Sequence, residues 1–477
     1  METEKKDVGD GYVKVNAFPA KRFFVEMLTR DIELIDAILD LIDNCLDGAM
    51  RRTEQDIASS ANPYEGYWAK IDFDGSNFRI EDNCGGIPRD IAINSAFRMG
   101  RPNNTRDKEL PTVGVYGIGM KRAIFKLGAE AKISSVNGDD HFSVSIDKSW
   151  MDDDLSWDLP FVDLAKDDSV CEGTIISVTQ LREGISRMLS DSVNFLAELR
   201  DVISTHFSFI ILKGFKIQVN GKPIEPTINF LNIGPDFYEK DEAIAPYLYK
   251  NTINDVDINL AVGFYRSLPD DDEEQYLKEG RSETRKAGWT IVCNDRVVVH
   301  ADKTKITGWG EAGVPQYHTQ FISISGTVFF YSNNPSKLPL TTTKRGIDGN
   351  SDIYLTVKEY MRDGLKTFTS YTNKIKSSGK AYSSFMSDKV VESKTGTSII
   401  DSLPKDKWIS SRKSSGGMVF RPKLPMPPAE IETRRIQFTR SLEDIQLLSE
   451  FFFDDVDRSA ALVGEKCFDE ALKRAKS

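Results

Sequence analysis

Residues 40–47 read DLIDNCLD, and this stretch decides how the rest of the chain is interpreted. Its polar residues follow the helical spacing and therefore share one stripe of a helix: Asp40, Asp43, Asn44 and Asp47. The opposite stripe is apolar and is expected to be buried. Three carboxylates and an amide on one edge repel one another, and a divalent metal or a lined cleft would relieve this. The alternative is an ordinary amphipathic helix with an acidic face toward solvent.

A second element, EDNCGGIP at residues 81–88, joins an acidic residue at the end of a strand to paired glycines. Glycine lets the backbone approach a ligand closely, and the Asp82 carboxylate could accept a hydrogen bond from the amine of adenine. A further element, EGTIISV at 172–178, opens another strand, where Thr174 could share that contact. The alternative at Asp82 is a simple Asx turn.

A glycine-rich loop, GVYGIGMK at residues 114–121, stands immediately before an expected helix. Successive glycines permit a turn whose amides face a phosphate, and the helix N-terminus adds partial positive charge. Lys121 could assist. The spacing is neither the Walker pattern nor a Rossmann fingerprint, because no strand precedes the loop as a βαβ unit requires.

Taken in order, the four elements resemble the ATP-binding domain of the gyrase, heat-shock chaperone, histidine kinase and MutL (GHKL) superfamily, over about residues 33–181. The resemblance implies ATP and Mg2+ as cofactors, with Asn44 as the metal ligand and Asp40 as the carboxylate that activates the attacking water. It also implies that Asp82 reads adenine and that residues 100–116 form a lid. The nucleotide-binding residues that it implies are Asn44, Asp47, Asp82, Gly86, Gly114, Val115, Gly117, Ile118, Gly119, Met120, Lys121 and Thr174.

Two residues depart from the pattern of the superfamily. Most dimeric relatives carry glutamate where this chain has Asp40, whose side chain is one methylene shorter; a shortfall of about 1 Å can cost ~10²-fold in rate. The glycine that usually stands two residues after the adenine-reading aspartate is Cys84 here, although Gly85 and Gly86 follow it. Slow hydrolysis is therefore expected.

The predicted fold class is α+β: a GHKL (Bergerat) sandwich with helices over a mixed, mostly antiparallel sheet, then an α/β, S5-like transducer domain and a helical C-terminal region. The expected ranges are an N-terminal arm at 1–20, an ATPase domain at 21–226, a transducer-like domain at 227–350, a long helix at 351–377, a basic linker rich in Pro, Ser and Gly at 378–439, and a C-terminal helix at 440–477. In the first domain we expect helices at 21–50, 89–99 and 118–127, strands at 130–136, 141–146 and 173–181, hairpins at 67–82 and 214–226, and a buried strand at 207–212. In the second we expect strands at 257–265, 288–299 and 321–331.

The transducer domains of gyrase, MutL, the ninety-kilodalton heat-shock chaperones and the Microrchidia (MORC) proteins give a basic residue to the terminal phosphate of ATP. The candidate here is Lys344 in SKLPLTTTKRGID, residues 336–348, which is similar to the Leu-Pro-Leu segment of the chaperones. A cation favours ATP over ADP only if it meets the terminal phosphate, and Lys344 is the catalytic candidate for this contact. Because it belongs to a separate predicted domain, it is expected to reach the nucleotide only when the two domains dock. Lys337 and Arg345 are less favoured substitutes, and two surface basic residues are the simpler alternative.

The compact length, DNCGG at 82–86 and NDRVVVHADK at 294–303 look most like bacterial stand-alone, MORC-like members of the superfamily. The leading hypothesis is a slow ATPase that drives a dimeric clamp or switch, with a homodimer formed on ATP binding. The alternatives are a chaperone-like ATPase acting on a protein client and a nearly inactive nucleotide-sensing scaffold.

Composition limits the partners. The 477 residues are 40% hydrophobic and 28% charged, without an apolar run long enough to span a bilayer. No secretory signal or cysteine-pair motif is evident, so a cytoplasmic location is expected. The net charge of −11 argues against coating of nucleic acid by the whole surface. Residues 371–435, however, hold nine Lys and four Arg against six acidic residues, and could contact DNA or an acidic protein client, or simply be solvated.

Overall fold

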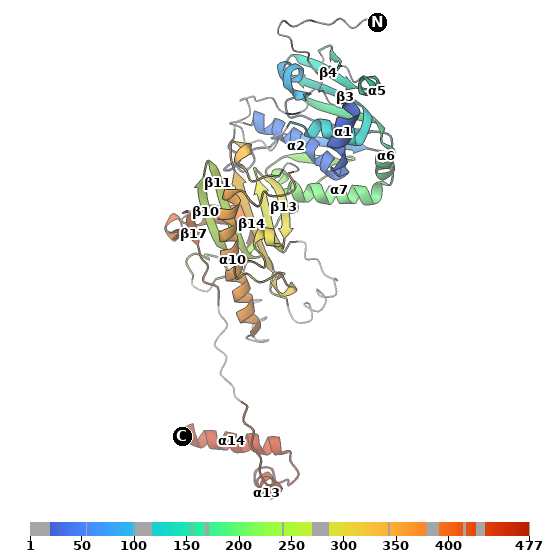
Figure 1. Ribbon diagram of the computed structural model, residues 1–477. Coiled ribbons are helices and arrows are strands. Elements are labelled where there is room, and N and C mark those ends of the chain that lie inside the picture. Colours follow the sequence, from blue (N-terminus) through green and yellow to red (C-terminus); the bar gives the residue numbers. More distant parts are fainter. Residues whose placement is uncertain are drawn as a thin grey trace, which may run out of the picture. The chain divides into compact units, whose positions relative to one another are not determined.

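The computed structural model describes residues 20–53, 55–98, 100, 117–153, 156–166, 171–240, 243–269, 286–341, 344–377, 391–413, 416–425 and 435–476. Two compact units divide the chain, Met1–Pro427 and Pro428–Ser477, and each is described by itself (Figure 1). Residues 1–19 of the expected arm and 101–116 of the expected lid lie outside the described residues, and so do Gly114 and Val115.

An eight-stranded sheet forms the first half of the larger unit, with the strand order β5-β4-β3-β6-β2-β1-β7-β8. Its strands are β1 (Trp68–Phe73), β2 (Phe78–Asp82), β3 (Gly128–Asn137), β4 (Asp140–Ile146), β5 (Phe161–Asp163), β6 (Gly173–Leu181), β7 (Lys216–Val219) and β8 (Lys222–Pro223). Only β1 and β7 pair parallel; the other neighbours are antiparallel. The expected mostly antiparallel sheet is therefore confirmed.

Helices pack against this sheet through one hydrophobic core, to which the longer ones all contribute: α1 (Lys21–Arg30), α2 (Leu34–Arg52), α4 (Gly119–Leu127) and α7 (Ser192–His206). Along α2 the side chains of Ile38, Ile42 and Leu46 are fully buried, which is the physical reason for the apolar stripe in the sequence. The shorter helical elements are α3 (Arg89–Ile91), α5 (Lys148–Asp152), α6 (Glu183–Ser190), α8 (Ser208–Leu212) and a π-helical turn at Ala92–Ala96.

Two of the expected helices differ in extent from the observed ones. The helix expected at 21–50 is broken, because α1 ends at Arg30 and Glu33 adopts an extended backbone before α2 begins. The helix expected at 89–99 is α-helical only as far as Ile91 and then continues as the π-helical turn. By contrast, the helix expected at 118–127 is confirmed as α4.

The apolar run at 207–212 was predicted as a buried strand, and that prediction is wrong. Most of it is the helix α8, with Phe209 and Ile210 buried. A short run of apolar residues has no periodicity when all its sides are buried, so it fits either structure. The hairpins expected at 67–82 and 214–226 are confirmed as β1–β2 and β7–β8.

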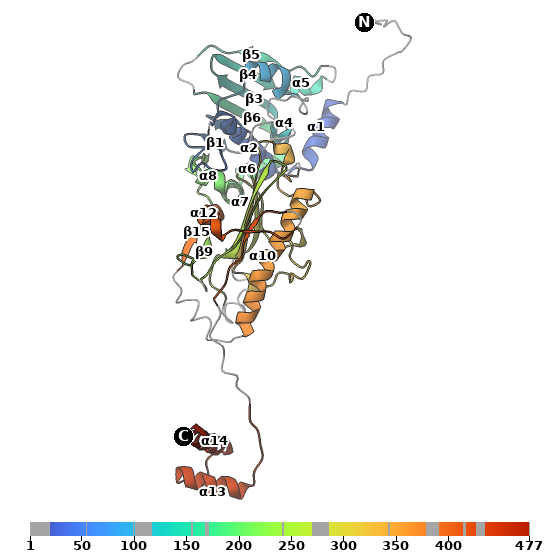
Figure 2. The ribbon, with the colours of Figure 1, turned by 90° about the vertical axis from the view of Figure 1, so that its left-hand side faces the viewer.

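A seven-stranded sheet forms the second half of the larger unit, with the order β13-β12-β14-β11-β10-β17-β16. Its strands are β10 (Tyr247–Ile253), β11 (Val256–Phe264), β12 (Gly288–Cys293), β13 (Arg296–Asp302), β14 (Ile324–Tyr331), β16 (Ile409–Ser410) and β17 (Met418–Phe420). The long helix α10 (Asp352–Ser377) lies along this sheet (Figure 2). Tyr249 and Leu260 belong to the core under α10, whereas their chain neighbours Leu248 and Ala261 belong to the core under α12 (Gly396–Ser402). Side chains alternate across a strand, so the two helices cover opposite faces.

The smaller elements in the described residues of this half include a separate strand pair and 3₁₀ turns. The pair is β9 (Leu231–Ile233) with β15 (Glu392–Lys394), and the turns lie at Lys305–Thr307, Thr319–Phe321, Pro335–Lys337 and Lys405–Lys407. The strand expected at 321–331 begins only after one of these turns, at Ile324.

The single strand expected at 288–299 is a hairpin. Asn294 and Asp295 turn the chain between β12 and β13 with φ of 45° and 64°. Both residue types tolerate the left-handed backbone that a two-residue turn requires. The prediction missed the turn because apolar strand residues stand on both sides of it.

The prediction of a linker at 378–439 is wrong over 391–425, because this segment contains the elements β15, α12, β16 and β17. β17 pairs with β10, for example through Phe420 and Leu248, and Trp408 is buried. The abundance of Ser, Gly and Pro in this segment indicated a flexible linker. Pairing with β10, a strand far back in the chain, overrides that local composition.

The two halves of the larger unit share one hydrophobic core. Residues of the second sheet belong to the cluster that fills the first half: Val292, Val297, Phe329 and Tyr331. Beside them the wholly buried carboxylate of Asp295 accepts hydrogen bonds from Tyr64 at 2.9 Å and Tyr331 at 2.7 Å. It also pairs with the Lys213 amine at 2.8 Å. A buried carboxylate with three donors holds its surroundings in one arrangement, so the β12–β13 hairpin fixes the two halves together.

The smaller unit holds two helices where the sequence predicted one. α13 (Leu442–Phe453) ends at Asp454, whose φ of 52° is left-handed, and α14 (Ala460–Lys476) follows. Large apolar side chains on both helices are exposed, among them Phe451 at 77% and Phe468 at 53%. In the described parts of the chain as a whole, no helix combines the length and apolar character needed to cross a membrane.

Candidate functional site

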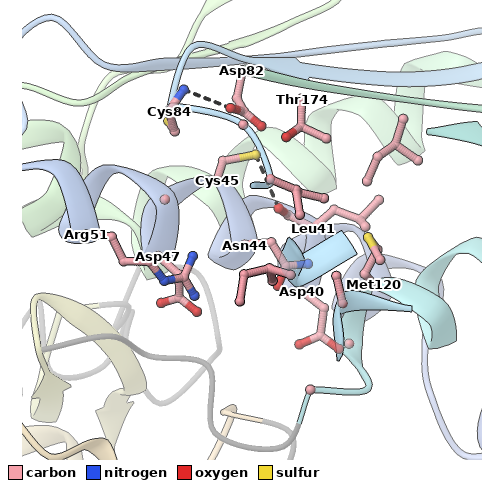
Figure 3. A pocket seen from close by; sticks show the side chains of 18 of the residues that line it. Asp40, Leu41, Asn44, Cys45, Asp47, Arg51, Asp82, Cys84, Met120 and Thr174 are labelled. Carbon is pink, nitrogen blue, oxygen red and sulfur yellow. Dashed lines mark hydrogen bonds between the residues drawn. The ribbon is translucent and has the colours of Figure 1, made fainter. Parts of the chain in front are cut away.

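A cavity of about 400 Å³ lies where α2, the end of β2 and the start of α4 meet (Figure 3). Its wall contains every site residue predicted from the sequence that falls within the described part of the chain: Asp40, Asn44, Asp47, Asp82, Gly86, Gly117, Ile118, Gly119, Met120, Lys121, Thr174 and Lys344. The structure therefore brings four separate sequence elements and one residue of the second half around a single space.

The polar stripe of α2 faces protein and cavity rather than solvent. Asp40, Asp43 and Asp47 are 4%, 1% and 3% exposed, so the alternative of an acidic solvent face is wrong. Asn44 is exposed between buried neighbours and lines the cavity. On this stripe of α2, Asn44 is thus the exposed side chain at the cavity, beside the buried carboxylates of Asp40 and Asp47.

The donor set at Asn44 fits Mg2+. An amide oxygen is a hard ligand of the kind that this ion takes, and Mg2+ in proteins commonly keeps one or two protein ligands, with phosphates and water as the rest. Within the described ranges, no cluster of three or more His, Cys, Asp or Glu side chains could hold a metal without such help. A metal at Asn44 would therefore depend on a phosphate-bearing ligand.

Asp40 lies where α2 meets the start of α4. Its Oδ2 accepts a hydrogen bond from Nη2 of Arg122 at 2.5 Å, and its Oδ1 is 4.0 Å from the Lys344 amine. Burial raises the pKa of the Asp40 carboxyl, and the charges of Lys344 and Arg122 offset only part of that rise. A Cβ at Gly119 would stand 3.3 Å from the Asp40 carboxyl carbon, so glycine there permits the close approach. The arrangement suits a general base beside a phosphate loop.

Asp43 does not line the cavity, and it is neutralised by the second half of the larger unit. Its Oδ1 accepts from Nε of Arg296 at 2.9 Å, and its Oδ2 accepts from the Lys344 amine at 3.1 Å. Burial raises the pKa of the Asp43 carboxyl, but the two cations outweigh it and hold the pKa below its ordinary value. The sequence predicted that a metal or a lined cleft relieves the repulsion along α2; for Asp43 the relief comes from Arg296 and Lys344 instead.

Asp82 and Thr174 lie beside each other, on the neighbouring strands β2 and β6. A Cβ at Gly173 would come within 1.9 Å of the Asp82 carbonyl oxygen, so glycine is required where the two strands approach. The Asp82 carboxylate accepts from the Cys84 amide at 2.8 Å. Burial raises the pKa of Asp82 to about 6. A half-buried acceptor at the cavity wall is suited to a ligand that donates an N–H group.

The turn after Asp82 depends on its glycines. Gly85 and Gly86 have φ of 94° and 66°, and a Cβ at Gly86 would meet the Val136 carbonyl oxygen at 2.1 Å. Cys84 is buried and does not have a positive φ. Cysteine at position 84 is therefore compatible with the turn, because the left-handed positions fall on the next two residues.

Lys121 lines the cavity but its amine is directed to the backbone. It donates to the carbonyl oxygens of Ala96, at 2.8 Å, and Gly117. Gly117 itself has a φ of 68°. The Lys121 amine thus holds Gly117, within the glycine-rich loop, and its expected assistance to a phosphate stays a prediction.

Two important residues of the site were not predicted. Arg122 follows the glycine-rich loop directly, so its place at the start of α4 was available as a signal. Arg296 stands in the segment 294–303, which drew attention only for its likeness to relatives. Its partner Asp43 is 253 positions earlier, and no local pattern connects the two.

Comparison with known proteins supports the nucleotide-binding interpretation. Residues 32–175 match the model of the family described as histidine kinase-, DNA gyrase B-, and HSP90-like ATPase. No curated protein matches the chain. The family match supports membership of the GHKL ATPase superfamily, and a domain of this kind implies ATP binding. The matched range holds α2, the Asp82 turn, the glycine loop and Thr174, whereas Lys344 lies beyond it.

Proposed function

We propose that this chain binds ATP with Mg2+ in the cavity, hydrolyses it slowly, and uses it to drive a dimeric clamp or conformational switch. One observation carries the proposal: Lys344, from the second half of the larger unit, lines the same cavity as Asp40 and Asn44. Because this cation belongs to the second half, the phosphate charge of a bound nucleotide can change the contacts between the two halves.

Each residue has a distinct role in this proposal. The amide oxygen of Asn44 holds Mg2+, which when bound would neutralise charge on the phosphates. Asp40 accepts a proton from the attacking water, since its carboxylate lies next to the phosphate loop and has a raised pKa. Asp82 accepts a hydrogen bond from the adenine amine, with Thr174 beside it.

Affinity for ATP is expected to fall as the pH drops through about 6, the pKa to which burial raises Asp82. Above this pH the group is a carboxylate and accepts from the adenine amine; below it the proton occupies that acceptor. Binding should therefore be about tenfold weaker near pH 5 than near pH 7. Burial raises the pKa of the neighbouring Cys45 and Cys84 thiols, so they stay neutral over this range.

Calorimetric titration with ADP at several pH values measures this effect. The control is Asp82→Asn, whose amide oxygen still accepts but has no proton to gain, so it should show only the pH dependence of the nucleotide phosphate, whose second pKa is about 6. A pH dependence of the wild type no larger than that of Asp82→Asn would assign the titration to the ligand or to another group.

Lys344→Ala is expected to weaken binding of a non-hydrolysable ATP analogue by about ten- to a hundredfold and to leave ADP affinity nearly unchanged. A charge-assisted contact is worth roughly 1.5 to 3 kcal/mol, and ADP lacks the phosphate that the amine meets. ATP-driven dimerisation, followed by light scattering, should fall together with the affinity for the analogue. A mutant that dimerises like the wild type would make Lys344 a structural lysine.

The movement of Lys344 differs from the one that the sequence suggested. Docking of a separate domain was expected to bring it to the nucleotide, but the two halves already share a core and Lys344 already pairs with Asp43. Its backbone φ of 55° is in the left-handed region, which costs a lysine about 1 kcal/mol or more. These contacts support a proposed switch in which the change is confined to this loop and its partners.

The client is proposed to be DNA, as for MORC-like proteins, with a protein client of a chaperone-like ATPase as the alternative. Part of the basic charge in 371–435 is already used inside the fold: Lys413 is 3.1 Å and Arg421 3.8 Å from Asp363 of α10. This weakens the case for a freely accessible basic surface. DNA binding that declines steeply with salt would favour the clamp, and absence of DNA binding would favour the protein client. A turnover assay separates both from the nearly inactive scaffold.

A further inference from the structure

Asp43 divides its two oxygens between two cations. Oδ1 accepts from Arg296 Nε at 2.9 Å and Oδ2 accepts from Lys344 Nζ at 3.1 Å. The side chains of Asp43 and Arg296 are both only 1% exposed, so no water competes for either oxygen. The orientation of the carboxylate is therefore set by Arg296, and Oδ2 is the oxygen left for the lysine.

Arg296 is itself fixed from several sides. Its Nη1 donates to the carbonyl oxygens of His206 at 3.1 Å and Val297 at 2.9 Å. The guanidinium carbon lies 4.1 Å from the centre of the Phe207 ring, an arrangement that adds a cation–π attraction. These contacts tie Arg296 to the C-terminal end of α7 and leave its side chain a single position.

The described contacts of the loop fix its backbone: a β-bridge joins Leu340 and Ile347, and the Lys344 amide donates to the Thr341 carbonyl oxygen at 3.0 Å. These contacts do not hold the Lys344 amine, which needs an anchor of its own. Asp40 lies 4.0 Å from the amine. Burial lowers the pKa of Lys344, but the charges of Asp43, Asp47 and Asp40 outweigh it and raise that pKa. A lysine side chain has four rotatable bonds and loses roughly 2 kcal/mol of rotamer freedom when it is held in place, so a rigid anion determines where its amine rests.

We propose that Asp43, oriented by Arg296, is a positioning residue that holds the Lys344 amine at the wall of the nucleotide cavity, ready for the terminal phosphate of ATP. This inference rests on the proposed role of Lys344. It adds a defined chain of contacts, from the end of α7 through Arg296 and Asp43 to Lys344, by which the second half of the larger unit distinguishes ATP from ADP. Neither Asp43 nor Arg296 lines the cavity, so both act only through the lysine.

The test is the ratio of affinities for a non-hydrolysable ATP analogue and for ADP, measured by calorimetry with Mg2+. Asp43→Asn should lower the ratio about tenfold, as Lys344→Ala does, because the amine is no longer held. In the Lys344→Ala background, Asp43→Asn should lower it no further. Arg296→Lys, which keeps a cation for Oδ1, should retain most of the ratio.

Asp43→Asn leaves Arg296 buried without an anion, which is strongly destabilising. The double variant Asp43→Asn with Arg296→Gln removes both charges at similar volume and keeps the measurement possible if the single variant does not fold. It should lower the ratio by the same factor. The matched control is Lys213→Gln with Asp295→Asn, which neutralises the other buried pair at the same junction, 2.8 Å apart and outside the cavity wall. That control should leave the ratio unchanged.

The outcomes separate the two claims. If Lys344→Ala leaves the ratio unchanged, the proposed role of the lysine fails and the positioning chain fails with it. If Lys344→Ala lowers the ratio but the neutral Asp43 and Arg296 pair does not, only the positioning chain is overturned. It is overturned as well if that pair weakens the ATP analogue and ADP equally, or if the Lys213 and Asp295 control lowers the ratio by as much, since either result means general loosening of the junction.

Discussion

Asp40→Asn should lower the turnover of ATP by at least about a hundredfold while ATP affinity stays within a few-fold of the wild type. General-base catalysis contributes typically 10² to 10⁴ in rate, and asparagine keeps the shape of the side chain but cannot accept the proton of the attacking water. The structure places Asp40 beside the glycine-rich segment at the start of α4, with its carboxyl carbon 3.3 Å from the position of a Cβ on Gly119. Steady-state phosphate release and calorimetry with the ATP analogue give the two quantities.

Two further variants sharpen this result. Asp36→Asn is the matched control, because Asp36 lies one turn earlier on α2, pairs with Arg345 and does not line the cavity; its turnover should stay close to that of the wild type. Asp40→Glu restores the side chain that most dimeric relatives carry. Faster turnover by this variant would show that the shorter carboxylate slows hydrolysis. Equal turnover by the wild type and Asp40→Asn would mean that another residue is the base.

The walls of the cavity could be predicted because each is a short contiguous motif. The spacing of residues 40–47 identifies the buried edge of a helix, and the glycines after Asp82 mark a turn that no other residue fits. The glycine loop at 114–121 precedes a helix, which is a local signal too. These patterns are set by backbone geometry within a few residues, so they do not depend on contacts with distant parts of the chain.

Features that depend on distant partners could not be predicted. The pairing of Asp43 with Arg296 joins two residues 253 positions apart, and the sequence shows only that Asp43 needs a counter-charge. The segment 391–425 has the composition of a linker but completes the second sheet through β17. For the apolar run 207–212, burial on all sides removes the periodicity that separates helix from strand. In each case tertiary contacts decide a question that local sequence leaves open.

Asn44→Ala should lower ATP affinity in the presence of Mg2+ by more than about a hundredfold, since changes even to groups that only support a metal ligand cost 10- to 100-fold. Asn44 is exposed between the buried residues Asp43 and Cys45, so its amide oxygen is accessible to a metal ion. Without its oxygen, the described cavity wall has no cluster of side chains that could hold the ion by itself. The charges of the phosphates would then meet the buried carboxylates of α2 without a bridging cation.

The decisive comparison is calorimetry of wild type and Asn44→Ala with Mg2+ and again with a chelator. The two proteins should differ with Mg2+ and bind ATP equally weakly with the chelator, because only the metal-dependent part of the affinity passes through Asn44. Asn194→Ala, exposed on α7 and outside the cavity wall, is the matched control and should bind like the wild type under both conditions. If Asn44→Ala keeps its Mg2+-dependent affinity, the ion must use another oxygen of the wall, and the carboxylate of Asp47, one turn further along α2, is the next to test.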